Sequence, residues 1–196
     1  MARTVDYQHR EAIVQRAADH LLERGVVAVS LRELAAAVGV SPRMLVHHFG
    51  SREQLVSSAV REARSRQREA FEARLAPQPA RPYADVLTDA WRWFATDEAR
   101  PYLRLFGQLY GLAQAPDSPH AEFLHESVLD WLPTIEEGFA ADGADPETAR
   151  ELSTLTLAVV RGLFQDANAT GDQERVSAAF ERYVALLHEP RRRASR

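Results

Sequence analysis

Apolar residues recur at intervals of three and four along almost the whole chain, and this spacing constrains the fold more than any other feature of the sequence. Residues three and four apart share one face of an α-helix, so the pattern predicts a series of amphipathic helices. No stretch combines alternating apolar and polar residues with β-branched enrichment and flanking turn dipeptides, the signature of a half-buried strand. We therefore predict an all-α protein.

Start and stop signals divide this pattern into separate helices. Gly25 ends the first apolar stripe, and Asp145-Pro146-Glu147 combines an N-cap residue, a first-turn proline and a first-turn acid. Pro133 is expected to kink a long helix, and the prolines between residues 77 and 82 mark a sharp corner. We expect a first helix that ends before Gly25, and then helices over residues 31–38, 42–49, 51–75, 83–95, 101–114, 119–141, 146–170 and 172–188.

Composition excludes several classes of protein. The chain has no cysteine, which rules out disulfide scaffolds, Cys-ligated metal sites and thiol catalysis. Its longest uncharged run, residues 105–116, is well short of the roughly 18–20 residues that span a bilayer. The charged N-terminus does not have the pattern of a secretory signal. We expect a cytoplasmic protein that does not interact with membranes.

Charge is distributed unevenly along the chain. Residues 1–68 contain eleven arginines and seven acidic residues, whereas residues 69–196 have a net charge of −8 and the whole chain −4. Such asymmetry favours a polyanion-binding N-terminal segment joined to a part with another role.

The segment from Ser30 to Leu55 carries the most specific signal. Ser30 and Glu33 form a capping box, Gly39 suits a left-handed turn, and Ser41-Pro42 starts a second short helix. Leu45 and Phe49 can pack this second helix onto the first, which leaves a polar outer face. Two short helices around a glycine turn are typical of a helix-turn-helix, although an ordinary helical hairpin has the same spacing.

Residues 10–60 resemble the DNA-binding domain of TetR-type transcriptional regulators. The matching residues are Ala12-Ile13, Ala17-Ala18, Gly25, Ser30-Leu31-Arg32-Glu33-Leu34-Ala35, Gly39-Val40-Ser41, His48-Phe49, Ser51-Arg52-Glu53 and Leu55. The resemblance implies an N-terminal three-helix domain with a helix-turn-helix, joined by a long helix to a C-terminal helical bundle that dimerises. It also implies an effector-responsive regulator, most simply a repressor, that binds double-stranded operator DNA as a homodimer.

The chain departs from the family at the second short helix. Arg43 replaces a small residue, Met44 replaces Thr or Ala, and Val46 replaces a tyrosine whose hydroxyl would suit a phosphate contact; Arg52 replaces a lysine. Arg43 could bind guanine O6 and N7 in the major groove, although an arginine here could equally be solvated. We expect DNA contacts from Arg32, Ser41, Pro42, Arg43, Met44, Val46, His47, His48 and Arg52. Arg3 and Arg10, in and after a flexible arm, either add phosphate or minor-groove contacts or belong to a solvated tail.

Aromatic residues are concentrated in the C-terminal part. Packing in the core is their default role, but the resemblance implies an effector cavity among them. The expected lining residues are Trp91, Phe94, Tyr102, Phe106, Tyr110, Phe123, His125, Trp131 and Phe164. Such a lining favours an apolar or aromatic small molecule oriented by Tyr102, Tyr110 or His125, whereas the neighbouring Arg104 is expected to face solvent.

Two apolar faces near the C-terminus suggest a dimer interface. Small residues recur every four positions at Thr154, Ala158 and Gly162, and apolar residues flank them. Two helices from each subunit would form a four-helix bundle, unless the same chain covers both faces. The expected interface consists of Thr154, Leu155, Ala158, Val159, Gly162, Leu163, Phe180, Tyr183 and Leu187.

These features give three expected parts and two alternative functions. The parts are a DNA-binding domain over 1–50, an effector and dimerisation domain over 51–190, and a basic tail over 191–196. One alternative is an architectural DNA-binding protein without an effector, which the acidic C-terminal half disfavours. The other is a di-metal enzyme, but Glu122 and His125 form one Glu-x-x-His unit where two are needed. We expect no enzymatic activity, no cofactor and no metal site.

Overall fold

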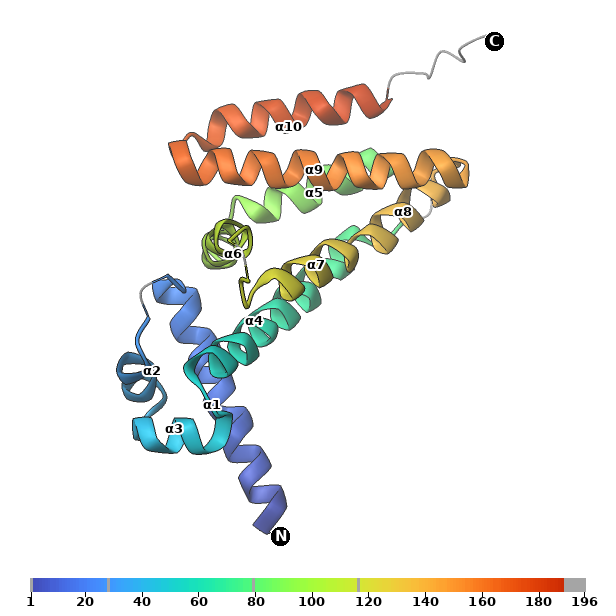
Figure 1. Ribbon diagram of the computed structural model, residues 1–196. Coiled ribbons are helices and arrows are strands. Elements are labelled where there is room, and N and C mark those ends of the chain that lie inside the picture. Colours follow the sequence, from blue (N-terminus) through green and yellow to red (C-terminus); the bar gives the residue numbers. More distant parts are fainter. Residues whose placement is uncertain (1, 28, 79, 116, 189–196) are drawn as a thin grey trace. The chain divides into compact units, whose positions relative to one another are not determined.

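The computed structural model of the protein describes residues 2–27, 29–78, 80–115 and 117–188, with side chains from residue 8 onward, and the predicted tail lies outside this part. The described residues form helices without any strand, as the sequence predicts (Figure 1). The helices are α1 (Ala2–Arg24), α2 (Leu31–Val38), α3 (Pro42–Phe49), α4 (Arg52–Leu75), α5 (Tyr83–Phe94), α6 (Arg100–Ala113), α7 (Ala121–Leu129), α8 (Leu132–Ala141), α9 (Pro146–Thr170) and α10 (Gln173–His188).

The chain forms two compact units, with boundaries inside α4 and α7. The first unit comprises Met1–Ala70 and Asp97–Ser127, and the second comprises Phe71–Thr96 and Val128–Arg196. This division differs from the predicted domains, because α6 and most of α7 join the helix-turn-helix segment.

The core of the first unit explains why α6 belongs to it. Leu105 and Leu109 of α6 are buried in the same apolar cluster as Leu21 of α1, Leu34 of α2 and Leu45 of α3. Burial of each such side chain stabilises the folded state by about 1.5–3 kcal/mol. Helix α6 is therefore part of the structure that holds the short helices.

Aromatic rings dominate the core of the second unit. Trp91 of α5 is stacked on Phe180 of α10 at 4.4 Å between ring centroids and on Phe164 of α9 at 5.0 Å. The Trp91 indole N–H also donates to Ser177 Oγ at 3.2 Å. These contacts join three helices that are well separated in the sequence.

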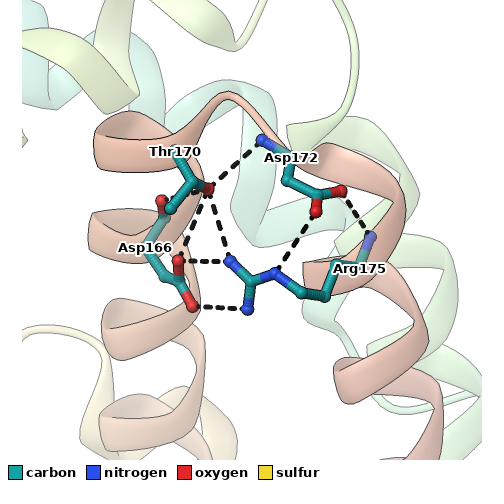
Figure 2. A network of polar contacts seen from close by, with 4 residues as sticks. All are labelled: Asp166, Thr170, Asp172 and Arg175. Atoms are coloured by element: carbon teal, nitrogen blue, oxygen red, sulfur yellow. Dashed lines mark hydrogen bonds and ion pairs between the residues drawn. The ribbon is translucent and has the colours of Figure 1, made fainter.

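A polar network fixes the corner between α9 and α10 (Figure 2). The Arg175 guanidinium donates two hydrogen bonds to the Asp166 carboxylate, at 2.5 and 2.9 Å. The backbone N–H of Arg175 donates to Asp172 Oδ1. The guanidinium holds the pKa of Asp166 below its ordinary value. Gly171, with φ of 71°, supplies the left-handed residue that ends α9.

Two predictions about helices were wrong. The predicted kinked helix over 119–141 is two helices, because α7 ends at Leu129 and α8 begins at Leu132. Pro133 lies in the first turn of α8, where its missing N–H costs no intrahelical bond. The expected flexible arm is also helical from Ala2, and the Arg3 side chain lies outside the described residues.

Candidate nucleic-acid interface

Local capping interactions form the two short helices of the first unit. Ser30 Oγ accepts from Glu33 N–H while the Glu33 carboxylate accepts from Ser30 N–H at 2.7 Å, and this completes the predicted capping box. Gly39 ends α2 with φ of 75°, and Met44 N–H donates to Ser41 Oγ at the start of α3. The segment therefore folds as two helices around a tight turn.

One face of α3 is buried and the other is open to solvent. Leu45 and Phe49 lie in the core, as predicted, whereas Met44 and Val46 are 40% and 45% exposed. The exposed side chains that share the outer surface with them include Ser41, Pro42, Arg43 and His47, and Arg32 of α2 is exposed as well. An apolar inner face and an open outer face allow α3 to enter a groove without disturbing the core.

His48 and Arg52 are more enclosed than the other predicted contact residues. His48 is half-buried, with ring contacts to His9, His47 and Phe49. Arg52 is also half-buried, and its Nε donates to the Val29 carbonyl at 2.5 Å. Arg52 also acts on a histidine far away in the sequence: burial lowers the pKa of His120, and the charge of Arg52 lowers it further. Arg52 therefore positions the start of α4 in addition to any contact with DNA.

Residues 13–59 match the family model described as "Bacterial regulatory proteins, tetR family". The HTH-type transcriptional regulator BetI of Rhizobium meliloti is 40% identical over 52 residues, 26% of either chain. The HTH-type transcriptional repressor KstR2 of Mycolicibacterium smegmatis is 36% identical over 53 residues, 27% of this chain and 26% of that one. The matched segment therefore spans about a quarter of these relatives. The structure of a transcriptional regulator from Rhodococcus has the same fold, with a TM-score of 0.73 and 24% identity over 90% of this chain and 94% of that one.

Residues 13–59 thus match the tetR family of bacterial regulatory proteins. The resemblance expected from the sequence is confirmed, because this segment is shared with HTH-type transcription regulators. Which individual side chains touch DNA stays a prediction.

Three side chains that hold this tetR-type domain together were missed in the sequence. Arg16 Nη1 of α1 donates to the Val38 carbonyl at 2.9 Å, next to the turn between the short helices. Gln108 of α6 accepts from Val26 N–H at 2.8 Å, and Arg104 Nη2 donates to the Leu22 and Glu23 carbonyls. Arg104 is exposed, as predicted, and its guanidinium also binds the end of α1. No local sequence pattern signals contacts between residues so far apart.

The aromatic residues predicted to line an effector cavity are divided between the units. Trp91, Phe94, Trp131 and Phe164 belong to the second unit, whereas Tyr102, Phe106, Tyr110, Phe123 and His125 belong to the first. Many pack on one another: Phe106 is stacked with Phe123, and Phe94 contacts Phe164 at 4.3 Å. Two hollows of about 280 and 620 Å³ occur in the second unit, and none of the nine residues lines either of them.

Most of the predicted interface on α9 is exposed. Leu155 is 50% exposed, Thr154, Ala158 and Gly162 are open to solvent, and Val159, Leu163 and Leu187 are half-buried. Phe180 and Tyr183 differ, because both are buried inside their own unit and the Tyr183 hydroxyl hydrogen-bonds Thr156. Their burial does not favour a contact with a partner, and the interface as a whole stays a prediction. Leu186 on α10, which is not among the predicted residues, is 51% exposed.

Neither a metal centre nor a membrane segment is found in the described ranges. Glu122 and His125 are both exposed, and no three His, Asp or Glu side chains among the described residues are placed to hold a metal ion. Over the same residues, no helix is long and apolar enough to cross a membrane.

Proposed function

We propose that the protein is a sequence-specific repressor of transcription in the cytoplasm and that α3 enters the DNA major groove. The observation that carries the proposal is the outer face of α3, where Pro42, Arg43, Val46 and His47 are exposed while Leu45 and Phe49 anchor the helix. Arg43 is the residue best suited to specify a base, because a guanidinium donates two hydrogen bonds to guanine. A repressor bound at a promoter excludes the polymerase from the same DNA.

A homodimer would place two copies of α3 on one operator. The exposed face of α9 around Leu155, Ala158 and Gly162, continued by Leu186 on α10, supports pairing between two subunits. No neighbouring atom lies within 4 Å of a Cβ placed on Gly162, so this position is open for the close approach of a partner helix. Two half-sites about one helical turn of DNA apart would then be bound together.

An apolar or aromatic effector would release the operator by shifting a conformational equilibrium. The many aromatic residues of the sequence between residues 91 and 164 favour this class of ligand. A shift from 1:99 to 99:1 requires roughly 5.5 kcal/mol of preferential binding to the released state. Arg104 and Gln108 support a role for α6 in this coupling, because both bind the chain at the end of α1.

The test of the DNA-binding proposal is Arg43→Ala, with Arg150→Ala as the control. Arg150 is an exposed arginine of α9. The Arg43 variant should lose about 1–3 kcal/mol of specific binding and relax base preference at one position in each half-site, because the guanine contact is lost. Selection of bound sequences from a random DNA library, with titrations on specific and nonspecific duplexes, measures both effects.

The control variant should bind like the wild type. If Arg43→Ala leaves the ratio of specific to nonspecific affinity unchanged, Arg43 does not specify a base. If the wild type itself has no sequence preference, the repressor proposal is wrong and the architectural alternative takes its place.

A further inference from the structure

A groove of about 620 Å³ lies in the second unit, away from the aromatic residues considered above. One wall is formed by the segment that leads into α5, including Pro77, Ala80 and Pro82. The other wall is formed by the last turn of α8 and the residues after it, including Gly138 and Ala141. Its volume is within the range of small-molecule sites.

Tyr83 gives this groove a polar group that no described residue satisfies. Its side chain lines the groove but is only 2% exposed, and its hydroxyl has no hydrogen-bond partner in the described part of the chain. Buried polar groups are almost always hydrogen-bonded, since a lost partner leaves the cost of desolvation uncompensated. An unsatisfied hydroxyl at the wall of a groove therefore points to a missing acceptor.

Gly138 also lines the groove and leaves room there for the ring of Tyr83. A Cβ atom on Gly138 would lie 2.0 Å from Tyr83 Cζ, the ring atom that bears the hydroxyl, so only glycine leaves room for the ring. Phe139 holds the ring from another side in a T-shaped contact, with centroids 5.0 Å apart. Burial raises the pKa of Tyr83, so the hydroxyl stays protonated and is available as a donor.

The charges around the groove favour a neutral ligand. Arg81 lines the groove, but its guanidinium is already bound to Asp89 at 2.5 Å and is therefore balanced. The Asp142 carboxylate also lines the groove and is exposed, and it would repel an anion. The remaining lining near Tyr83 is largely proline, alanine and glycine, which suits an apolar body.

We propose that this groove is a binding site for a small, uncharged, largely apolar molecule with a carbonyl-type acceptor that receives a hydrogen bond from the Tyr83 hydroxyl. The apolar part of the molecule lies against Pro77, Pro82 and Ala141. The site does not depend on DNA binding, and it is separate from the aromatic residues assigned above to the effector.

Two matched probes test the role of the hydroxyl. Acetophenone carries the carbonyl acceptor and ethylbenzene lacks it, and ligand-observed NMR up to 1 mM measures the affinity of the full chain for each. The wild type should bind acetophenone about three to ten times more tightly, the effect of one net hydrogen bond. Tyr83→Phe should remove this preference, while Tyr183→Phe, the same change at a buried tyrosine whose hydroxyl already bonds Thr156, should retain it.

A second pair of variants tests the location. Ala141 lines the groove, whereas its exposed neighbour Ala140 on α8 does not. Ala141→Leu should fill the groove and weaken both probes at least tenfold, and Ala140→Leu should bind them like the wild type. Equal effects of the two variants would overturn the assignment of this groove.

The ligand-free protein provides an independent measurement. Because the hydroxyl lacks a partner, Tyr83→Phe should leave the Tm unchanged or raise it. A lower Tm would show that the hydroxyl is already satisfied and would overturn the proposal. Absence of acetophenone binding, or loss of its preference in Tyr183→Phe but not in Tyr83→Phe, would overturn it as well.

Discussion

Arg52 combines a structural contact with a position suited to DNA binding. Its Nε donates to the Val29 carbonyl, 23 residues away in the sequence, and so holds the start of α4 against the chain before α2. The first turn of α4 also presents backbone N–H groups and the positive end of a helix dipole, which favour a phosphate. One side chain can therefore affect both folding and DNA affinity, and substitution can separate the two.

We predict that Arg52→Ala lowers both the stability of the first unit and its affinity for all DNA sequences. Loss of the bond to Val29 should cost about 1 kcal/mol, and loss of a phosphate contact should flatten the dependence of affinity on salt. Arg52→Lys should keep part of the salt dependence, because its charge remains. Urea unfolding and DNA titrations at several salt concentrations measure these effects, and an unchanged salt slope in Arg52→Ala would exclude the phosphate contact.

Helix α3 depends on a single side-chain cap. Ser41 Oγ accepts from Met44 N–H, and Ser41 is also exposed at the end of the helix expected to meet DNA. Serine and aspartate are both good N-cap residues, but only aspartate adds negative charge. Substitution at this position therefore distinguishes capping from recognition.

We predict that Ser41→Ala destabilises the first unit by about 0.5–2 kcal/mol, because α3 loses its cap. Ser41→Asp should restore stability but bind DNA more weakly than the wild type, because the carboxylate approaches phosphates. Thermal unfolding and operator titration of the two variants give the comparison. DNA affinity in Ser41→Asp equal to that of the wild type would place residue 41 away from the phosphate backbone.

At the scale of the whole molecule, the exposed part of α9 and α10 is the surface expected to join two subunits. Leu155 on α9 and Leu186 on α10 are each about half exposed, and a partner subunit would cover them. The network of Arg175 with Asp166 and Asp172 holds the corner between these two helices (Figure 2).

We predict that Gly162→Leu separates the dimer while the helical content of each subunit is retained. Among the described residues, no atom outside the neighbouring turns of α9 lies within 4 Å of a Cβ at this position, so the added side chain has room within the subunit and would obstruct a partner helix. Operator affinity should fall sharply, since two half-sites must be bound together. Sedimentation measures the change, and Gly111→Leu, at another open glycine, is the control. A wild type that is monomeric at micromolar concentration would remove the basis of the prediction.

The sequence by itself determined the helices and the family-specific DNA-binding domain, because the decisive interactions are local. The capping box of Ser30 and Glu33 and the left-handed Gly39 involve residues no more than a few positions apart, so their pattern is visible without a structure. The break between α7 and α8 is the exception, since a proline fits a kinked helix and a first turn equally well. Nine predicted DNA contacts and the effector lining stay predictions.

Only the tertiary structure decided which side chains meet across long separations. The hydrogen bond between Val26 and Gln108 joins residues 82 positions apart, and the ring of Tyr83 lies over Gly138. Burial of Phe180 and Tyr183, which the helical pattern places on a free face, likewise depends on how α9, α10 and α5 pack. The physical reason is that periodicity shows which face of a helix is apolar but not what covers it, and this is settled by the packing of side chains from distant parts of the chain.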